Sequence, residues 1–249
     1  ITAVAALGLE PGDEIITTPW TMSATAMAIL HNNCIPVFAD IDPDTYNLDP
    51  ESVRKRITSR TRAVLAVDIF GLSANIIALR EICDDFGLLL LSDSAQAPGA
   101  KVHGKYAGTL ADIGGFSLNY HKHIHCGEGG VIVTDDEQLA TRCQLIRNHA
   151  ESAVVDMGFE HQPCMVGYNF RLTEIDAAIA NEQLPKLEAA VQEKQKQADI
   201  LNSVLGETIG IHLPKIPDEH SHAYYIFGIQ LDCKRVPDAR EQLLKRLGT

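Results

Sequence analysis

Short apolar runs alternate with amphipathic segments along most of the chain, and this alternation restricts the fold more than any other feature. The clearest run, residues 88–91, consists of four leucines and is apolar on both faces of an extended strand. Strands buried on both faces are typical of parallel sheets covered by helices. The sequence therefore predicts an α/β fold with a doubly wound, mostly parallel sheet.

Other segments follow the same two patterns. Further strands are expected at residues 14–18, 35–39, 63–67, 113–118, 131–133 and 223–231. Helices are expected at 23–31, 50–57, 74–86, 137–148 and from 173 onward, and Pro185 should kink or divide the last one. The helix at 23–31 should pack Ala24, Met27, Ala28 and Leu30 inward. We expect a large domain over 1–195 and an incomplete small domain over 196–249.

Composition excludes several classes of protein. The chain has 249 residues, 45% of them hydrophobic, and 21 basic against 33 acidic side chains give a net charge of −12. With no basic block, nucleic acid is not an expected partner, and no apolar run is long enough to span a membrane. The six cysteines form no C-x-x-C pair, which favours reduced thiols in a cytoplasmic protein. Because Ile1 starts within an apolar helical pattern without a cap, we expect an internal fragment.

Lys122 is the first candidate for chemistry. It lies between two short apolar runs, and Gly127, Gly129 and Gly130 mark the return of the chain. A lysine that loses water favours its neutral amine, and a neutral amine can attack a carbonyl and hold it as a Schiff base. Lys122 is therefore a candidate anchor for an aldehyde cofactor, although most lysines in turns are only solvated charges.

A second polar cluster follows the leucine run. Asp93 should project from the carboxyl end of that strand, where ligands collect in open α/β sheets, and could pair with a cationic ring nitrogen or a metal. A helix-capping role for Asp93 is the alternative. Gln96 offers a donor and an acceptor to the same pocket. His121, His123 and His125, with Cys126, could bind zinc, but loop histidines lining a polar pocket fit the spacing better.

Several motifs, in order along nearly the whole chain, resemble the DegT/DnrJ/EryC1/StrS family of pyridoxal-phosphate sugar aminotransferases. The matching stretches are 11–14, 24–26, 36–46, 93–97, 116–130, 147–149 and 167–171. The spacing from Lys122 to the Gly-Glu-Gly-Gly segment at 127–130 is the most specific of them. The resemblance implies fold type I, with a mostly parallel sheet of the seven-stranded type and a smaller C-terminal α/β domain.

The resemblance also implies roles for individual residues. Lys122 matches the Schiff-base lysine, and Asp93 matches the carboxylate that keeps the pyridine nitrogen of pyridoxal 5'-phosphate protonated. Gln96 matches the residue beside the phenolic oxygen of the ring, and Ser117 matches a hydroxyl that contacts the phosphate. Asn169 matches an amide that reaches the phosphate from a neighbouring subunit, so a homodimer with a shared active site is implied.

Two departures from the family pattern concern the cofactor pocket. Where the family commonly places an aromatic side chain over the ring, this chain has Met22, and the nearby aromatic is Trp20. Either side chain could cover the ring. The Gly-Thr phosphate segment of the family would lie before Ile1. His149, Tyr168 and the loop expected at 151–166 are candidate substrate-side groups, although ordinary polar loop residues fit equally well.

The resemblance implies an aminotransferase that moves an amino group from an amino acid, glutamate being usual, to a nucleotide-linked keto-sugar. Lys122 would serve as both the anchor and the general acid and base. Two alternatives stay open. Some relatives are sugar dehydratases in which a histidine replaces the lysine, and His121 and His123 flank Lys122. Other relatives act as regulators that keep the cofactor pocket without turnover.

Overall fold

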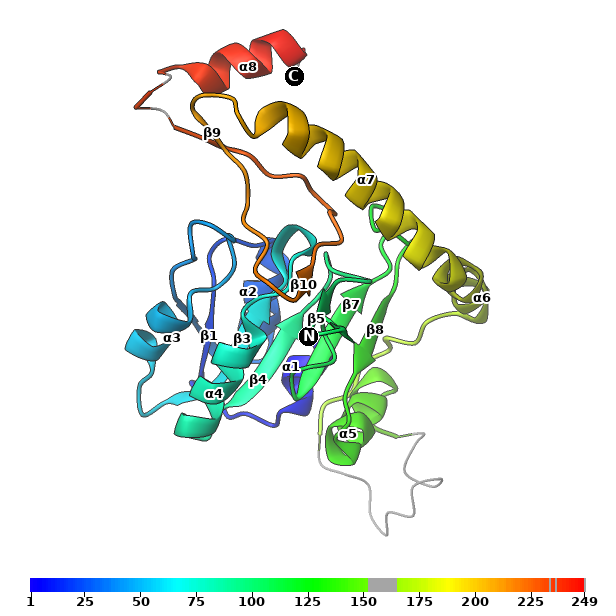
Figure 1. The fold of residues 1–249 in the computed structure, drawn as a ribbon. Coiled ribbons are helices and arrows are strands. Elements are labelled where there is room, and N and C mark those ends of the chain that lie inside the picture. Colours follow the sequence, from blue (N-terminus) through cyan, green and yellow to red (C-terminus); the bar gives the residue numbers. More distant parts are fainter. Residues whose placement is uncertain (152–164, 233, 236, 249) are drawn as a thin grey trace.

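A six-stranded sheet forms the centre of the computed structural model, which describes residues 1–151, 165–232, 234–235 and 237–248 (Figure 1). The strand order is β2-β1-β3-β4-β7-β8, and every neighbouring pair is parallel except β7 and β8. The predicted α/β fold with a mostly parallel sheet is confirmed. Among the described residues this sheet has six strands, and none of these residues pairs with the outer edge of β2 or β8.

The strands and helices alternate along the chain. The sheet strands are β1 (Glu14–Thr17), β2 (Ile35–Phe38), β3 (Thr61–Val67), β4 (Leu89–Asp93), β7 (Ile113–Ser117) and β8 (Gly130–Val133). The helices around them are α1 (Thr2–Ala6), α2 (Ser23–His31), α3 (Pro50–Arg56), α4 (Ile76–Phe86) and α5 (Glu137–Arg147). Short strands β5 (Lys101–Val102), β6 (Lys105–Tyr106) and β10 (His220–Ser221) form a second sheet.

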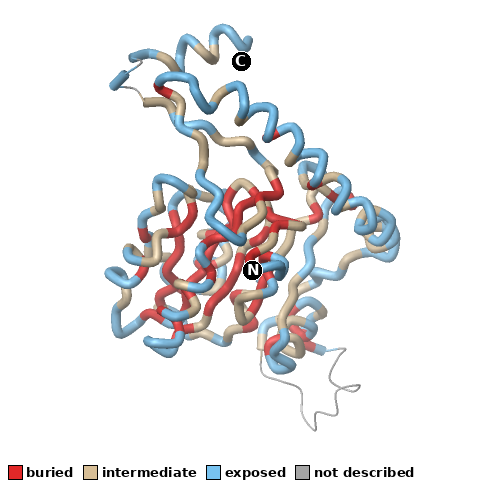
Figure 2. Tube along the Cα trace, in the orientation of Figure 1, coloured by how far each residue is buried: buried red, intermediate tan, exposed pale blue. Residues whose placement is uncertain are grey.

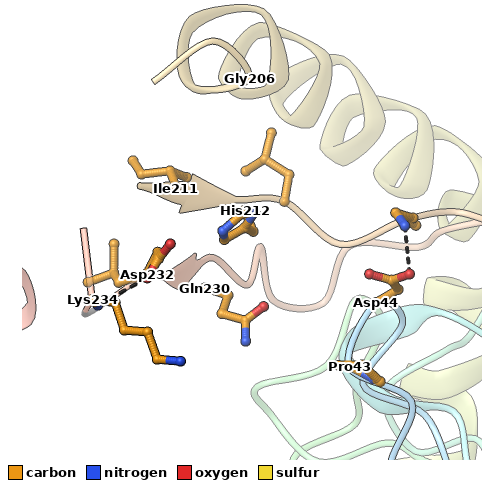
Figure 3. Close-up of a pocket in the computed structure, with 11 residues that line it drawn as sticks. Pro43, Asp44, Gly206, Ile211, His212, Gln230, Asp232 and Lys234 are labelled. Carbon is orange, nitrogen blue, oxygen red and sulfur yellow. Dashed lines mark hydrogen bonds and ion pairs between the residues drawn. The ribbon is translucent and has the colours of Figure 1, made fainter. Parts of the chain in front are cut away.

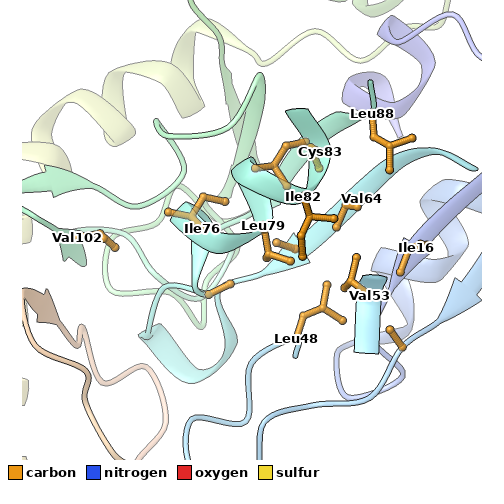
Figure 4. Close-up of a cluster of buried hydrophobic side chains, with 14 residues drawn as sticks. Ile16, Leu48, Val53, Val64, Ile76, Leu79, Ile82, Cys83, Leu88 and Val102 are labelled. Carbon is orange, nitrogen blue, oxygen red and sulfur yellow. The ribbon is translucent and has the colours of Figure 1, made fainter. Parts of the chain in front are cut away.

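Hydrophobic side chains are buried on both faces of the central sheet. Successive residues of β3 alternate between two core clusters: Val64 and Ala66 pack with α3 and α4, whereas Leu65 and Val67 pack with side chains of α1, α2 and α5. Figure 4 shows the first cluster, and Figure 2 shows the buried strands between more exposed helices. This arrangement explains why residues 88–91 are apolar throughout, because Leu90 and Leu91 belong to different clusters.

The inward face of α2 differs from the prediction. Thr25 and Ile29 are buried, whereas Met27 and Leu30 are 57% and 50% exposed. The difference arises because the Thr25 hydroxyl donates a hydrogen bond to Asp93, which turns this polar residue toward the sheet. The pattern of apolar residues alone could not reveal that contact.

The helical pattern that starts at Thr173 is divided as predicted. Helix α6 (Glu174–Gln183) is followed by a 3-10 turn at Leu184–Lys186 and by the long α7 (Leu187–Leu205). Pro185 lies in that turn, where its missing N–H is tolerated. The predicted domain boundary at 195 falls within α7, and the division into two domains stays a prediction.

The strand expected at 223–231 is wrong for most of its length. Only Gln230–Leu231 (β11) is extended there, paired with β9 (Ile211–His212), and α8 (Ala239–Leu247) follows. Residues 222–226, which we call the strap, return to the central sheet instead, as the orange segment in Figure 1 shows. Tyr224 has a φ of 51°, a left-handed conformation that a strand cannot contain.

Two further expectations concern less regular parts of the chain. Of the loop predicted at 151–166, residues 152–164 lie outside the described residues. Among the described helices, none has the length and apolar character needed to cross a bilayer.

Candidate functional site

The carboxyl ends of four parallel strands lie along one edge of the sheet. Strands β1, β3, β4 and β7 run in the same direction, so the loops that follow them are neighbours. Asp93 pairs with Gly115 of β7, two residues before Ser117. Ligands of open α/β sheets bind at this edge. The topology therefore brings Asp93, Gln96, Ser117 and Lys122 to the same side of the molecule.

Lys122 is presented by a loop that is closed by its own hydrogen bonds. The Lys122 N–H donates to the Asn119 carbonyl over 2.9 Å, and the Asn119 side chain donates to Glu128 Oε1 over 2.7 Å. A bridge pairs Asn119 with Gly127, whose φ of 97° favours glycine. The glycine that marks the return of the chain thus helps to fix the position of Lys122.

The Lys122 amine lies against the ring of Tyr225. Its Nζ is 4.4 Å from the ring centroid, close enough for a cation–π contact. Burial lowers the pKa of Lys122, and the Asp93 carboxylate opposes this by raising it. The Asp93 carboxylate therefore lies near enough to Lys122 to act on the pKa of its amine. At a given pH the amine carries its proton less often than an ordinary lysine does.

Asp93 is held from two sides. Its Oδ2 accepts a hydrogen bond of 2.8 Å from the Thr25 hydroxyl of α2, and its Oδ1 accepts one of 3.2 Å from the Ala95 N–H. The Thr25 hydroxyl lies 2.9 Å from that of Thr21. These contacts fix the carboxylate at the end of β4. The helix-capping alternative does not describe this geometry, because no described helix begins at residues 94–97.

A buried carboxyl lies next to Asp93. Asp68, at the end of β3, accepts hydrogen bonds from the Ser92 and Ser94 hydroxyls over 3.0 and 2.5 Å and from the Ala74 N–H over 2.9 Å. Burial is the main cause that raises its pKa. The Asp68 N–H donates to the Asp93 carbonyl over 2.9 Å. Asp68 therefore connects the ends of β3 and β4 beneath the site.

The remaining predicted residues differ in how they are held. Gln96 Oε1 accepts a 2.7 Å hydrogen bond from the Phe70 N–H, and Ser117 Oγ accepts one of 3.3 Å from the Asn119 N–H. Met22 is 69% exposed, and Trp20 is 50% exposed with its ring in a T-shaped contact with that of Phe70. Asn169 is exposed and forms a backbone bridge with Asn148. These contacts do not place Asn169 with Lys122.

The three histidines near Lys122 have different surroundings. His123 Nε2 lies 2.7 Å from the Ala223 carbonyl, whereas His121 and His125 are exposed. Within the described part of the chain, no three His, Cys, Asp or Glu side chains are placed to hold a metal ion. Of the substrate-side candidates, Tyr168 Oη lies 3.1 Å from His31 Nε2 and His149 has a left-handed φ of 59°.

The sequence did not identify Thr25 and Tyr225 as residues of the site. Thr25 looked like an ordinary helix residue, and Tyr225 looked like part of a strand. The sequence signals for Thr25 are its place in the family-like stretch 24–26 and its hydroxyl one helical turn before the buried Ile29. No local signal identifies Tyr225, because its contact with Lys122 depends on the return of a distant segment.

A separate cavity of about 790 Å³ lies between the loop after β2 and the segments around β9 and β11 (Figure 3). Its lining includes Asp44 and Lys215, which form an ion pair of 2.6 Å, together with His212 and Gln230. None of the predicted site residues lines this cavity. The cavity and the Lys122 site are therefore different places on the molecule.

Comparison with known proteins agrees with the geometry. The family model described as "DegT/DnrJ/EryC1/StrS aminotransferase family" matches residues 1–249. A protein named "Pleiotropic regulatory protein" from Geobacillus stearothermophilus is 36% identical over 231 residues, which are 92% of this chain and 60% of the relative. "GDP-perosamine synthase" from Vibrio cholerae is 35% identical over 231 residues, 92% of this chain and 61% of that relative.

A solved structure supports the same fold. The crystal structure of S. venezuelae DesV in complex with a ketimine intermediate has a TM-score of 0.90 and 32% sequence identity. The match covers 99% of this chain and 64% of that one. The chain thus spans less than two thirds of the length of each of these three proteins.

Proposed function

This chain belongs to the DegT/DnrJ/EryC1/StrS aminotransferase family, and we propose that it is the cofactor-binding part of a pyridoxal-phosphate-dependent aminotransferase. The amino donor is an amino acid, glutamate in our proposal, and the acceptor is a keto-sugar carried on a nucleotide. The acceptor proposal draws on the relative named for GDP-perosamine. The observation that carries the activity is the half-buried Lys122 amine with its lowered pKa beside Asp93.

The chemistry of the site residues fits pyridoxal 5'-phosphate. Lys122 supplies an amine for covalent attachment, Asp93 a carboxylate for the ring nitrogen, Gln96 a group for the phenolic oxygen and Ser117 a hydroxyl for the phosphate. Trp20 or Met22 covers the ring. When bound, the cofactor supplies an electron sink for the carbon that loses a proton. The firm support of Asp93 by Thr25 and Ala95 suits a carboxylate that must stay ionised beside a cationic ring.

Lys122 has a second role in the proposal, as the group that moves a proton. A general base is effective when its pKa lies near the working pH, so that a useful fraction is unprotonated. Burial brings the pKa of Lys122 down in that direction, whereas the neighbouring Asp93 limits the shift. A histidine at this position would favour the dehydratase alternative, but the residue that contacts Tyr225 and senses Asp93 is a lysine.

Replacing Lys122 with Ala tests the proposal. We expect K122A to lose the visible absorbance of the lysine-bound cofactor and at least about a thousandfold in amine transfer, since both roles of the amine disappear. The exposed Lys105→Ala is the matched control and should keep both signals. An unchanged spectrum in K122A would remove Lys122 from the anchor role.

Incubation of the wild-type protein with glutamate distinguishes the rival activities. Conversion of the bound cofactor to its amine form supports an aminotransferase. Cofactor binding without conversion by any amino acid would favour a regulatory role, in line with the name of one relative. Loss of a sugar hydroxyl without amine transfer would favour a dehydratase.

The same proposal includes a homodimer in which Asn169 reaches the phosphate of the partner. Asn169 is exposed, as a residue that acts across an interface must be in a single chain. Apolar side chains are also exposed nearby: Leu30 of α2, next to His31, is 50% exposed, and Phe170, stacked on Tyr168, is 44% exposed. Exposed apolar groups that gather on one face favour a protein interface.

A cytoplasmic location also belongs to the proposal. Cys34, Cys83, Cys126 and Cys143 are free thiols, and burial raises the pKa of each, to about 12 for Cys83 and about 11 for Cys143. Buried, protonated thiols behave as small hydrophobic groups, which suits a reducing compartment. Fractionation of the source cells with activity measured in each fraction is the direct check, and activity outside the cytosolic fraction would contradict it.

A further inference from the structure

The strap, residues 222–226, crosses the site from a distant part of the sequence and is fastened on both sides. Toward the sheet, the Ala223 N–H donates to the Gly71 carbonyl over 2.8 Å and the Ile226 N–H donates to the Phe70 carbonyl over 3.2 Å. Toward α7, the Gln195 side chain donates to the His222 carbonyl over 3.0 Å. The strap is thus part of the wall of the site, and Tyr225 is the residue that it brings to Lys122.

His123 supplies the fastening closest to the reactive amine, one residue after Lys122. Its Nε2 lies 2.7 Å from the Ala223 carbonyl. A carbonyl oxygen only accepts, so Nε2 carries the proton and donates. Nδ1 is then an acceptor, and it is buried without a hydrogen-bond partner among the residues that the structure describes. Burial lowers the pKa of His123, which agrees with a neutral ring that has a single N–H. The Nε2–H group donates its hydrogen bond to the Ala223 carbonyl of the strap.

Close packing leaves the strap little freedom to lie elsewhere. A Cβ at Gly71 would stand 2.9 Å from the Tyr224 nitrogen and 3.0 Å from the Tyr225 nitrogen, so the loop after β3 touches the strap backbone directly. Ala223 is fully buried, and His222 stacks on Tyr224 with ring centroids 4.0 Å apart. Tyr225 itself lies 6.1 Å from the His123 ring.

We propose that His123 is a positioning residue that fastens the strap through the Ala223 carbonyl, so that the Tyr225 ring covers the Lys122 amine and keeps water away from it. The inference rests on the proposed function of Lys122 as the reacting amine. It assigns to His123 and Tyr225 the control of the solvation of that amine. Neither His123 nor Tyr225 exchanges a proton with substrate in this proposal.

The ring of Tyr225 has two opposite effects on Lys122. Its negative face attracts the ammonium, which would raise the pKa of Lys122. Its bulk excludes water, which lowers that pKa. Burial is the dominant cause of the observed direction, and the pKa is lowered. Other charged groups also contribute: Asp93 raises the pKa of Lys122, and Lys194 and Lys122 lower the pKa of His123. Exclusion of water is therefore the effect to test.

The first experiment measures hydrogen exchange of the strap amides in the cofactor-free protein. In His123→Phe, which keeps a ring but has no donor, exchange at Ala223 and Ile226 should rise on the order of tenfold. His123→Gln can still donate from its side-chain amide and should exchange within about threefold of wild type. Exchange in the middle of β4, where Leu90 is fully buried, reports on global unfolding. Unchanged strap exchange in His123→Phe would overturn the fastening role.

The second experiment measures the pKa of Lys122 in the same cofactor-free variants, from the pH dependence of its labelling by a small acylating reagent. Tyr225→Ala and His123→Phe should both raise the pKa toward that of ordinary lysine, whereas Tyr225→Leu, which keeps bulk but no ring face, should leave it lowered. If Tyr225→Ala lowers the pKa further, attraction outweighs water exclusion and the covering role is wrong.

These outcomes separate from those of the proposed function. Neither measurement requires bound cofactor or turnover, so a chain without aminotransferase activity could still show a fastened strap. Conversely, a failure of His123→Phe to change exchange or labelling leaves the anchor role of Lys122 untouched, because K122A tests that role by absorbance.

Discussion

The Asp93 carboxylate acts on the Lys122 amine at the end of the sheet. Asp93 raises the pKa of Lys122, although burial has the larger effect and lowers it. In the proposed function, Asp93 stays charged and the Lys122 amine loses its charge. Their supports differ accordingly: Asp93 receives two hydrogen bonds, whereas the amine faces an aromatic ring.

Replacing Asp93 with Asn should lower the pKa of Lys122 further, because the anion that stabilises the ammonium disappears. In the cofactor-free protein, labelling of Lys122 by an acylating reagent should therefore begin at a lower pH than in wild type. The exposed Asp85→Asn is the control and should leave the labelling profile unchanged. A higher pH onset in D93N would show that Asp93 does not act on the amine in this way.

His222 should make the fold sensitive to acid. Burial lowers its pKa from 6.5 to about 4, so the unfolded chain binds a proton at a pH where the folded chain does not. Between pH 6.5 and 4 the free energy of unfolding should fall, by up to about 3 kcal/mol from this group alone. His222→Asn cannot titrate, yet its side-chain oxygen can accept the Tyr224 N–H in place of Nδ1.

The measurement is urea denaturation at several pH values between 4 and 7. As the pH falls from 6.5 to 4, the free energy of unfolding should decrease more in wild type than in H222N. Substitution of the exposed His103 with Asn should give no such trend. A constant difference between wild type and H222N across this range would contradict the buried, neutral state of His222.

At the scale of elements, the sequence predicted what depends on local chemistry. The strands predicted at 14, 35 and 63 and the helices predicted at 23, 50 and 137 begin within two residues of their predicted starts. For the helices at 50 and 137, the caps Asp49 and Asp136 act within the first turn. Asp93 and Lys122 were candidates because each follows an apolar run. The strap was not, because its hydrogen bonds to Phe70, Gly71 and His123 join residues at least 100 positions apart.

Strand β7 contains adjacent glycines with opposite requirements, which gives a matched test of packing. A Cβ at Gly114 would stand only 1.9 Å from the Gly108 carbonyl oxygen, whereas a Cβ at Gly115 would meet nothing within 4 Å. Gly114→Ala should therefore destabilise the fold by at least about 3 kcal/mol or prevent folding. Gly115→Ala should change stability by less than about 1 kcal/mol.

Chemical denaturation of the two variants checks this prediction. Both substitutions add one methyl group to the same strand, so differences in strand propensity cancel. Equal losses of stability in the two variants would show that the approach of Gly108 to β7 does not control the packing of this strand.

For the whole molecule, the central observation is that apolar surface remains outside the two core clusters. On α2, Met27 is 57% exposed, and on the opposite side of the sheet Ile77 of α4 is 46% exposed. The homodimer proposal places Leu30 of α2 near the partner subunit, and we extend it to Met27, three residues earlier on the same helix, whereas Ile77 is left to solvent. The two surfaces can be tested with the same change of side chain.

Met27→Lys should shift the protein from dimer to monomer, because an interface must then bury an unpaired charge. Ile77→Lys should leave the dimer intact. Sedimentation velocity over a range of protein concentrations measures both. A monomeric wild type, or a dimer that resists Met27→Lys, would contradict the assignment of this surface to the interface.

The strap also has a consequence for the order of events during synthesis. The imidazole at His123 and the carbonyl that it holds are separated by 100 residues. At roughly 5 to 20 residues per second, a ribosome needs about 5 to 20 s to deliver the second after the first. During that interval the Lys122 amine of the nascent chain is not covered by the Tyr225 ring. The Tyr225 ring can cover the Lys122 amine only after the strap has been synthesised. A translation product that stalls or ends before the strap therefore keeps this amine exposed.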